Sequence, residues 1–232
     1  MPDPVFTRYL RGRKQEAAAA DGKLWFLSAW ALSVIFHPLL IPTYSTLLMF
    51  RFGADFLPLP AAGKWALLTF LFGGTFLIPL AGIILLWSAG LIGSLSMEER
   101  KDRHLPHLLA FSAFLGTAFL LVYFLPGLAL PGLLLLASAI SVGITGLITL
   151  YWKISSHLVG MGGFLGFQLA LAGLSQSQDF LLPIVLSILL CVALAASRRY
   201  LKAHDNLQLL AGFFLGMVIS SLTVSFFAEF FL

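Results

Sequence analysis

The stretch SRRYLKAHDNLQLLAGFFLG, residues 197–216, joins the end of one long apolar run to the start of the next. Three cations and His204 fall within seven residues of it, in a chain with only 10% charged residues. Charges at a membrane border often serve only as anchors in the lipid interface. A histidine six residues after Arg198, with the hydrogen-bonding Gln208 four residues further on, also suits a group that holds a phosphate and attacks it.

The rest of the chain is strongly apolar. Its 232 residues are 59% hydrophobic, and the mean hydropathy is +0.97. A soluble domain is about half apolar and about a quarter charged. Apolar runs of roughly 20 residues recur here without the alternation of a lipid-facing β-barrel. The composition therefore predicts an all-α, polytopic transmembrane helical bundle of one domain, with membrane lipids and phosphates as partners.

Other protein classes fit the composition poorly. The net charge of +4 is too small and too scattered for nucleic-acid binding. Cys191 is the single cysteine of the chain, so an internal disulfide is excluded.

A polar tail, residues 1–23, precedes a transmembrane domain, residues 24–232. Proline and glycine inside the first two spans predict kinks at Pro38, at Pro42, at Gly73-Gly74 and at Pro79. In lipid, a neighbouring group must satisfy each carbonyl that a kink frees, and we expect His37 to be one such partner. The predicted spans are about Leu24–Phe50, Lys64–Leu95, Leu108–Leu125, Leu133–Trp152, Leu158–Leu174, Phe180–Ala196 and Leu207–Phe231.

Seven spans fix which loops share a face of the membrane. The N-terminus and the loops after spans two, four and six lie on one side. Three polar stretches, MEERKDRHLPH (97–107), WKISSHLVGMGG (152–163) and residues 197–216, therefore meet at one face and predict one composite site. The basic residues of the tail place that face on the cytoplasmic side by the positive-inside rule.

The helix that follows His204 should begin close to it. Asp205 and Asn206 are good N-cap residues, and the free N–H groups of a helix start favour an anion. If that helix starts early enough, Gln208 reaches back to His204.

Small residues predict which spans pack most closely. Gly162-x-x-x-Gly166 and Gly212-x-x-x-Gly216 are small-xxx-small faces on spans five and seven. Close packing of these two helices would bring His157 next to the final junction.

Two histidines and several cations at one membrane face suit phosphoryl transfer. One histidine attacks phosphorus, the other protonates the leaving oxygen, and the cations hold the non-bridging oxygens. This chemistry needs no metal and no cofactor. The carboxylates near the site alternate with cations, which predicts salt pairs instead of a metal site; they are Glu98, Glu99, Asp102 and Asp205. His104 and His107 are expected to be loop or border residues.

The final junction resembles a motif of the type 2 phosphatidic acid phosphatase superfamily of membrane lipid phosphatases. The third motif of that superfamily is SR-x5-H-x3-D. Ser197, Arg198 and His204 match it in type and spacing, and Gln208 stands at the position of the aspartate.

The other two motifs are matched less completely. Ser156-His157 resemble the end of the second motif, PSGH, without its proline and glycine. The first motif, K-x6-RP, is represented by ERKDRHLP, which supplies Lys101, Arg103 and Pro106 without the spacing. The resemblance extends over most of the chain from about residue 24. Within the superfamily, the chain is most similar to an uncharacterised bacterial branch.

The resemblance implies roles for these residues. The nucleophile would be His204, the general acid His157, and Gln208 would orient the nucleophile. Phosphate would be bound by Arg198, by Lys101 or Arg103, and by Ser156. The superfamily acts on the outer face of the bacterial inner membrane, in conflict with the charge count of the tail.

Three functions follow from these observations. The first is a phosphatase that hydrolyses a lipid phosphate or diphosphate. The second is a catalytically impaired relative that binds a phosphorylated lipid or moves lipid without turnover, which the missing aspartate favours. The third is a small-solute transporter with broken helices; the sequence shows no inverted repeat that supports it.

Overall fold

The chain is an all-α, multi-pass membrane protein, as the composition predicts. The computed structural model describes residues 22–53, 57–97, 99–175 and 178–231, so most of the predicted polar tail lies outside the described part. Within these ranges seven helical segments are long and apolar enough to cross a membrane. The elements are α2 (Gly22–Ile35), η1 (Pro38–Leu40), α3 (Ile41–Phe52), α4 (Ala61–Phe72), the π-helical turn η3 (Gly73–Leu77), α5 (Ile78–Ser88), η4 (Arg100–Arg103), α6 (His104–Phe124), η5 (Pro126–Leu128), α7 (Ala129–Thr149), α8 (Ser156–Ser175), η6 (Gln178–Phe180), α9 (Leu181–Tyr200) and α10 (Asn206–Phe231).

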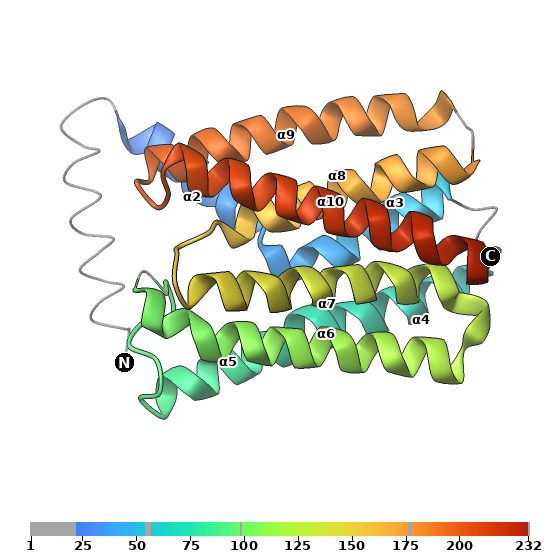
Figure 1. Cartoon of the computed structure of the whole chain (residues 1–232), viewed down its shortest axis with the longest axis horizontal. Helices are drawn as coiled ribbons and strands as arrows, with labels where there is room; N and C mark the ends of the chain where they lie inside the picture. The colour runs from blue at the N-terminus through green and yellow to red at the C-terminus, as the bar shows by residue number, and fades with distance from the viewer. Residues whose placement is uncertain (1–21, 54–56, 98, 176–177, 232) are drawn as a thin grey trace.

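The spans run along a common axis, so the connections gather at two ends (Figure 1). The start of α2 and the connections α5–α6, α7–α8 and α9–α10 lie at the left-hand end of that view. The prediction that the three polar stretches meet at one end of the bundle is confirmed. This end is called the site end below, and the other is called the apolar end.

The first span is broken in the middle, as its prolines predict. Helix α2 ends at Ile35, and α3 begins at Ile41 after a short 3-10 turn. The ring of His37 accepts a hydrogen bond from the N–H of Leu39 at 3.3 Å and so caps that turn. His37 therefore binds an N–H group, and its expected role as the partner of a freed carbonyl is wrong.

Two other side chains satisfy the carbonyls at the break. Nε2 of His157 lies 3.0 Å from the carbonyl oxygen of Ser33, and the hydroxyl of Tyr44 donates to the carbonyl of Ile35 at 2.8 Å. Helix α8 is thereby fastened to the broken span through His157, which lies in its first turn.

The second span contains a π-helical turn between Gly73-Gly74 and Pro79, where the sequence predicts kinks. The N–H of Ile78 reaches the carbonyl of Gly73, five residues back. Pro79 has no N–H to continue the regular ladder, which explains the bulge. A Cβ on Gly74 would overlap the side chain of Thr117 on α6, so glycine allows the close approach of these two helices.

The second span ends earlier than the predicted Leu95. Gly90 adopts a left-handed conformation with φ of 72°. Its N–H donates to the carbonyl of Trp87, and the N–H of Leu91 donates to the carbonyl of Leu86. This pair of bonds is a Schellman motif. The backbone therefore stops the helix at Ser88 although the apolar sequence continues.

Helices α8 and α10 make the closest contact of the bundle's core, as their small residues predict. A Cβ on Gly162 would overlap the carbonyl oxygen of Phe213, and a Cβ on Gly216 would overlap that of Val159. The two backbones touch directly, so the start of α8 is held against the start of α10.

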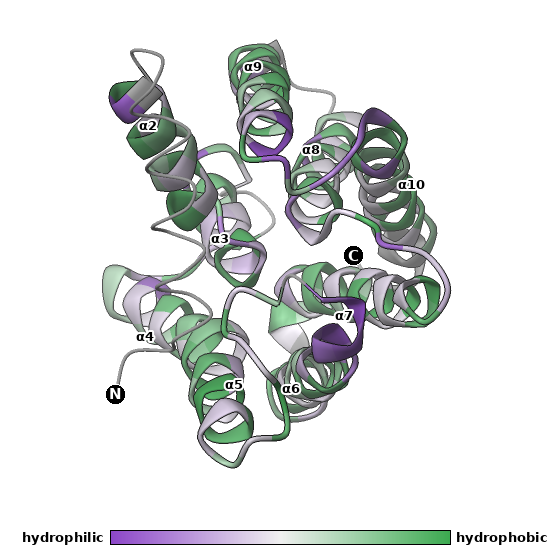
Figure 2. Cartoon of the chain, turned by 90° about the vertical axis from the view of Figure 1, so that its left-hand side faces the viewer, coloured by the Kyte–Doolittle hydropathy of each residue, from purple (hydrophilic) through white to green (hydrophobic). Residues whose placement is uncertain are grey.

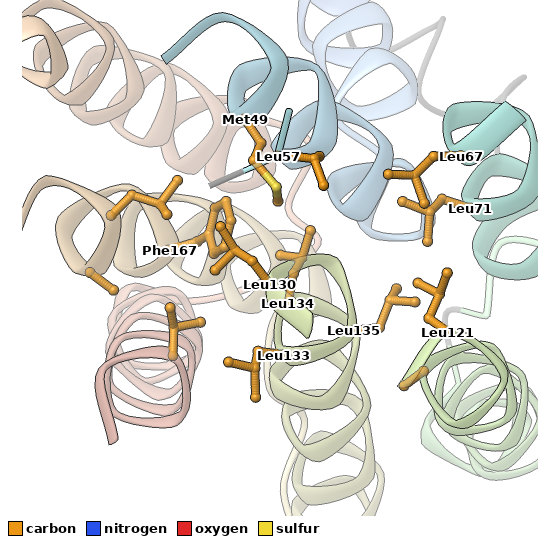
Figure 3. Close-up of a cluster of buried hydrophobic side chains, with 14 of the residues drawn as sticks. Met49, Leu57, Leu67, Leu71, Leu121, Leu130, Leu133, Leu134, Leu135 and Phe167 are labelled. Carbon is orange, nitrogen blue, oxygen red and sulfur yellow. The ribbon is translucent and has the colours of Figure 1, made fainter. Parts of the chain in front are cut away.

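The apolar end is filled by side chains from several helices (Figure 3). Met49, Leu71, Leu135, Phe167 and Phe180 are each 0% exposed within this cluster. It is a packed hydrophobic core of the kind that sets the stability of a bundle.

Candidate functional site

A cavity of about 580 Å³ opens at the site end of the bundle. Figure 2 looks at this end and shows the hydrophilic residues of the α9–α10 connection standing out against the green helices. Aromatic and aliphatic side chains of α2 and α5 line one part of the cavity. Its other part is polar and is lined by His37, Arg103, His107, Lys153, Ser156, His157, Arg198, Lys202 and His204.

The chain turns sharply between Arg198 and His204, as their spacing requires. Arg198 lies in the last turn of α9, where a cation suits the helix dipole. The N–H of Ala203 donates to the carbonyl of Arg198, and the N–H of Lys202 donates to that of Arg199, each at 3.0 Å. Lys202 occupies the left-handed position of this Schellman motif with φ of 52°, where glycine is usual.

Helix α10 starts immediately after His204. Asp205 is the N-cap, since its Oδ1 accepts a hydrogen bond from the N–H of Gln208 at 2.9 Å. That early start places Gln208 one turn beyond His204, and Oε1 of Gln208 lies 2.9 Å from Nδ1 of the histidine. An amide oxygen can only accept, so Nδ1 of His204 carries the proton and Nε2 presents a lone pair.

His204 is buried among cations. The pKa of its imidazole is lowered to about 3, chiefly by burial; the hydrogen bond to Gln208 opposes this shift, while the charges of Arg103, Arg198 and Lys153 add to it. The ring is therefore neutral at physiological pH, and a neutral imidazole is the nucleophilic form.

His157 lines the same cavity, so the close α8–α10 contact brings both histidines to one site. Its Nε2–H is engaged by the carbonyl oxygen of Ser33, because that oxygen can only accept. Nδ1 of His157 is consequently the nitrogen that can exchange a proton. The rings of His157 and His37 meet edge to face, with centroids 5.8 Å apart.

Arg198 is positioned by α2. Its Nη1 donates to the hydroxyl of Ser33 at 3.3 Å, and that hydroxyl donates in turn to the carbonyl of Ala29 at 2.9 Å. Ser33 thus orients Arg198 through its hydroxyl and His157 through its carbonyl, although it belongs to none of the motifs.

The two candidate cations of the first motif point in different directions. Arg103 is buried, lines the cavity, and donates to the carbonyl oxygens of Met97 at 2.8 Å and Ile154 at 3.3 Å. The Lys101 side chain is 75% exposed and pairs with Glu99 at 2.8 Å. The structure therefore brings Arg103 to the site and leaves Lys101 outside it.

Sequence reasoning did not assign His107 or Lys153 to the site. Helix α6 begins at His104, earlier than predicted, because Pro106 is tolerated in a first helical turn. His107 therefore lies on the helix and reaches the cavity, where its Nε2 lies 3.1 Å from Oγ of Ser156. Lys153 reaches the cavity from the connection between α7 and α8. In the sequence, its position three residues before Ser156 is the signal that could have assigned it to the site.

The carboxylates near the site have structural partners. Oδ1 of Asp102 accepts the N–H of Gly93 at 3.0 Å, Glu99 pairs with Lys101, and Asp205 caps α10; Glu98 lies outside the described residues. Within the described part of the chain, no three His, Cys, Asp or Glu side chains are grouped so that they could hold a metal ion. A mechanism without metal or cofactor remains a prediction.

Comparison of the chain with protein-family models, with curated proteins and with solved structures gives no match. The likeness to the phosphatase superfamily therefore rests on the motif residues alone.

Proposed function

We propose that the chain is an integral phosphatase of the bacterial inner membrane that hydrolyses a lipid phosphate or diphosphate through a phosphohistidine. One observation carries this proposal. A buried, neutral His204 is held through Nδ1 by Gln208, so that Nε2 presents its lone pair in a cavity lined by Arg103, Arg198 and Lys153.

In the first step Nε2 of His204 bonds to phosphorus, and the bond from phosphorus to the leaving oxygen breaks. His157, in the cationic form that carries a proton on both ring nitrogens, gives its Nδ1 proton to that oxygen and becomes neutral while its Nε2–H stays on Ser33. Arg198 and Arg103 stabilise the charge on the non-bridging oxygens. In the second step water releases phosphate and restores His204.

The amphipathic lining supports a lipid substrate. Phe26, Trp30 and Val34 of α2 line the cavity together with Ile83 of α5. A phosphorylated headgroup fits the cations, and a hydrocarbon chain fits this apolar part.

The decisive assay is phosphate release by the purified protein in detergent, from a panel of lipid phosphates and diphosphates. We expect vanadate-sensitive release that falls at least about 10³-fold in His204→Ala, because no phosphohistidine forms without the nucleophile. His104→Ala is the matched control, since His104 lies at the same end but does not line the cavity. Equal release by wild type and His204→Ala would contradict the mechanism.

Gln208 favours a second function, binding of a phosphorylated lipid without turnover. An amide orients the ring of His204, but it brings no negative charge to stabilise the cation formed when Nε2 binds phosphorus. This function predicts no phosphate release by wild type and lipid-phosphate binding that is lost in Arg198→Ala. A gain of release in Gln208→Asp would show that only the acid is missing.

A further inference from the structure

A second cavity, of about 50 Å³, adjoins the site. It is called the chamber here. His107 and Ser156 line both the chamber and the larger cavity, together with Pro38 and Val142, so these residues separate the two spaces. The chamber lies among α3, α6, α7, α8 and α10, inside the bundle.

The lining of the chamber is mostly apolar, but several hydroxyl groups of the membrane-spanning helices also line it. Ser45, Ser138, Ser141, Thr145, Ser156 and Ser220 contribute hydroxyl groups to its lining. Two of these hydroxyl hydrogens are used inside α7, where Ser138 donates to Leu134 and Thr145 donates to Ser141. Their oxygens remain available as acceptors.

One of these hydroxyls points to a ligand. Ser45 is 0% exposed, and its Oγ has no hydrogen-bond partner among the residues that the structure describes. A buried hydroxyl without a partner is unfavourable, all the more in a membrane-spanning segment. A water molecule needs about 10–15 Å³ of such volume and two to four polar partners, so the chamber has room for about three.

His107 and Ser156, which separate the two spaces, are joined by a hydrogen bond. Nδ1 of His107 lies 2.6 Å from the carbonyl oxygen of Arg103 and must donate to it. Nε2 of His107 therefore accepts the hydroxyl hydrogen of Ser156, at 3.1 Å. The lone pairs of the Ser156 oxygen remain to accept a hydrogen bond, beside His157 in sequence.

We propose that the chamber stores the water that hydrolyses the phosphohistidine. The inference rests on the proposed function. A lipid headgroup that fills the larger cavity displaces bulk water from it, and the adjoining chamber can supply the attacking water. Water from the chamber passes Ser156 and bonds through its oxygen to phosphorus. The bond from phosphorus to Nε2 of His204 breaks, its electron pair returns to Nε2, and the water's proton goes to Nδ1 of His157.

The first test fills the chamber. Ala137 lines it and is 1% exposed, so Ala137→Val occupies the space without changing a polar group. With a ³²P-labelled lipid phosphate, we expect phosphoenzyme to form at the wild-type rate and to accumulate, while steady-state release falls at least about tenfold. Ala196→Val, at an exposed position of α9, should behave as wild type.

Two results would overturn the inference. Formation and breakdown of phosphoenzyme that are both unchanged, or that fall together, would show that the chamber has no specific part in hydrolysis. Failure of the proposed function is distinguishable, because the wild-type protein would then form no phosphoenzyme at all.

The second test asks whether the chamber holds water and does not need turnover. If Ser45 bonds to water, Ser45→Ala loses a hydrogen bond, and Tm should fall by about 2–4 °C. If the chamber is dry, the same change removes a hydroxyl without a partner, and Tm should stay the same or rise. The latter result would overturn the proposal.

Discussion

The two ends of this bundle are built from the same helices, but one end is tightly packed and the other encloses a cavity. At the apolar end, side chains such as Leu135 and Phe167 are fully buried and pack against one another (Figure 3). At the site end the helices leave a cavity of about 580 Å³, lined by histidines and cations. The apolar end is a packed core, and the site end holds the proposed active site. The comparison teaches that mutations at the two ends should affect different measurements.

The largest effect is expected at the contact between α8 and α10, two helices that run from one end of the bundle to the other. Gly216→Leu would force a side chain into the backbone of Val159. We expect a loss of stability above about 3 kcal/mol, since overpacking alone costs about 1–3 kcal/mol and here the obstacle is backbone. Thermal unfolding in detergent should show it. Gly173→Leu is the control, because a Cβ at that position meets nothing within 4 Å. A Gly216→Leu protein that is folded and active would refute the role assigned to this contact.

The next test separates the two ends directly. Phe167→Ala should lower the free energy of unfolding by about 3–5 kcal/mol, as for other buried aromatic residues, and leave kcat of the remaining folded protein near wild type. Arg198→Ala should do the reverse, with release reduced about 10²–10³-fold, the usual cost of removing one donor to a developing oxyanion. If both variants lose stability and rate to the same degree, the division between the ends is wrong.

A smaller effect is expected from pH. The His204 pKa of about 3 in the folded chain lies below the value near 6.5 expected when it is unfolded. The unfolded chain therefore binds more protons between these values, so this histidine's contribution to stability is lost as pH falls from about 6.5 toward 3. Tm measured from pH 7 to pH 4 should fall less steeply in His204→Gln than in wild type. Parallel curves would show that His204 is not a source of the dependence.

The smallest effect concerns the turn that presents His204. Lys202 holds a left-handed backbone that costs a non-glycine residue about 1–2 kcal/mol. Lys202→Gly should therefore raise the free energy of unfolding by roughly 0.5–1 kcal/mol after the added chain entropy is counted. It should also weaken binding of a lipid phosphate, because a cation leaves the cavity. A stable variant with unchanged binding would show that the strained turn has no functional purpose.

Much of the fold could be predicted from the sequence, for physical reasons. Long apolar runs define spans, the parity of seven spans assigns loops to ends, and small-xxx-small faces select the α8–α10 contact. Local chemistry was also accessible. Asp205 predicts where α10 begins, and that start places Gln208 one turn from His204.

The rest of the site depends on tertiary geometry that spacing does not carry. Lys101 and Arg103 are two residues apart and look equivalent in the sequence, yet only one of them faces the cavity. His37 and His107 reach it because one helix breaks and another starts early. Ser33 matters through its carbonyl, which no side-chain motif can reveal.

The most direct test of the central claim is to trap and map the phosphoenzyme. The protein is mixed with ³²P-labelled lipid phosphate or diphosphate, quenched in alkali, in which phosphohistidine is stable, and digested for mass spectrometry. We predict an acid-labile phosphate on Nε2 of His204, absent from His204→Ala and present in His104→Ala. Release of phosphate by the wild-type protein with no label on His204, or with label on another residue, would contradict the account.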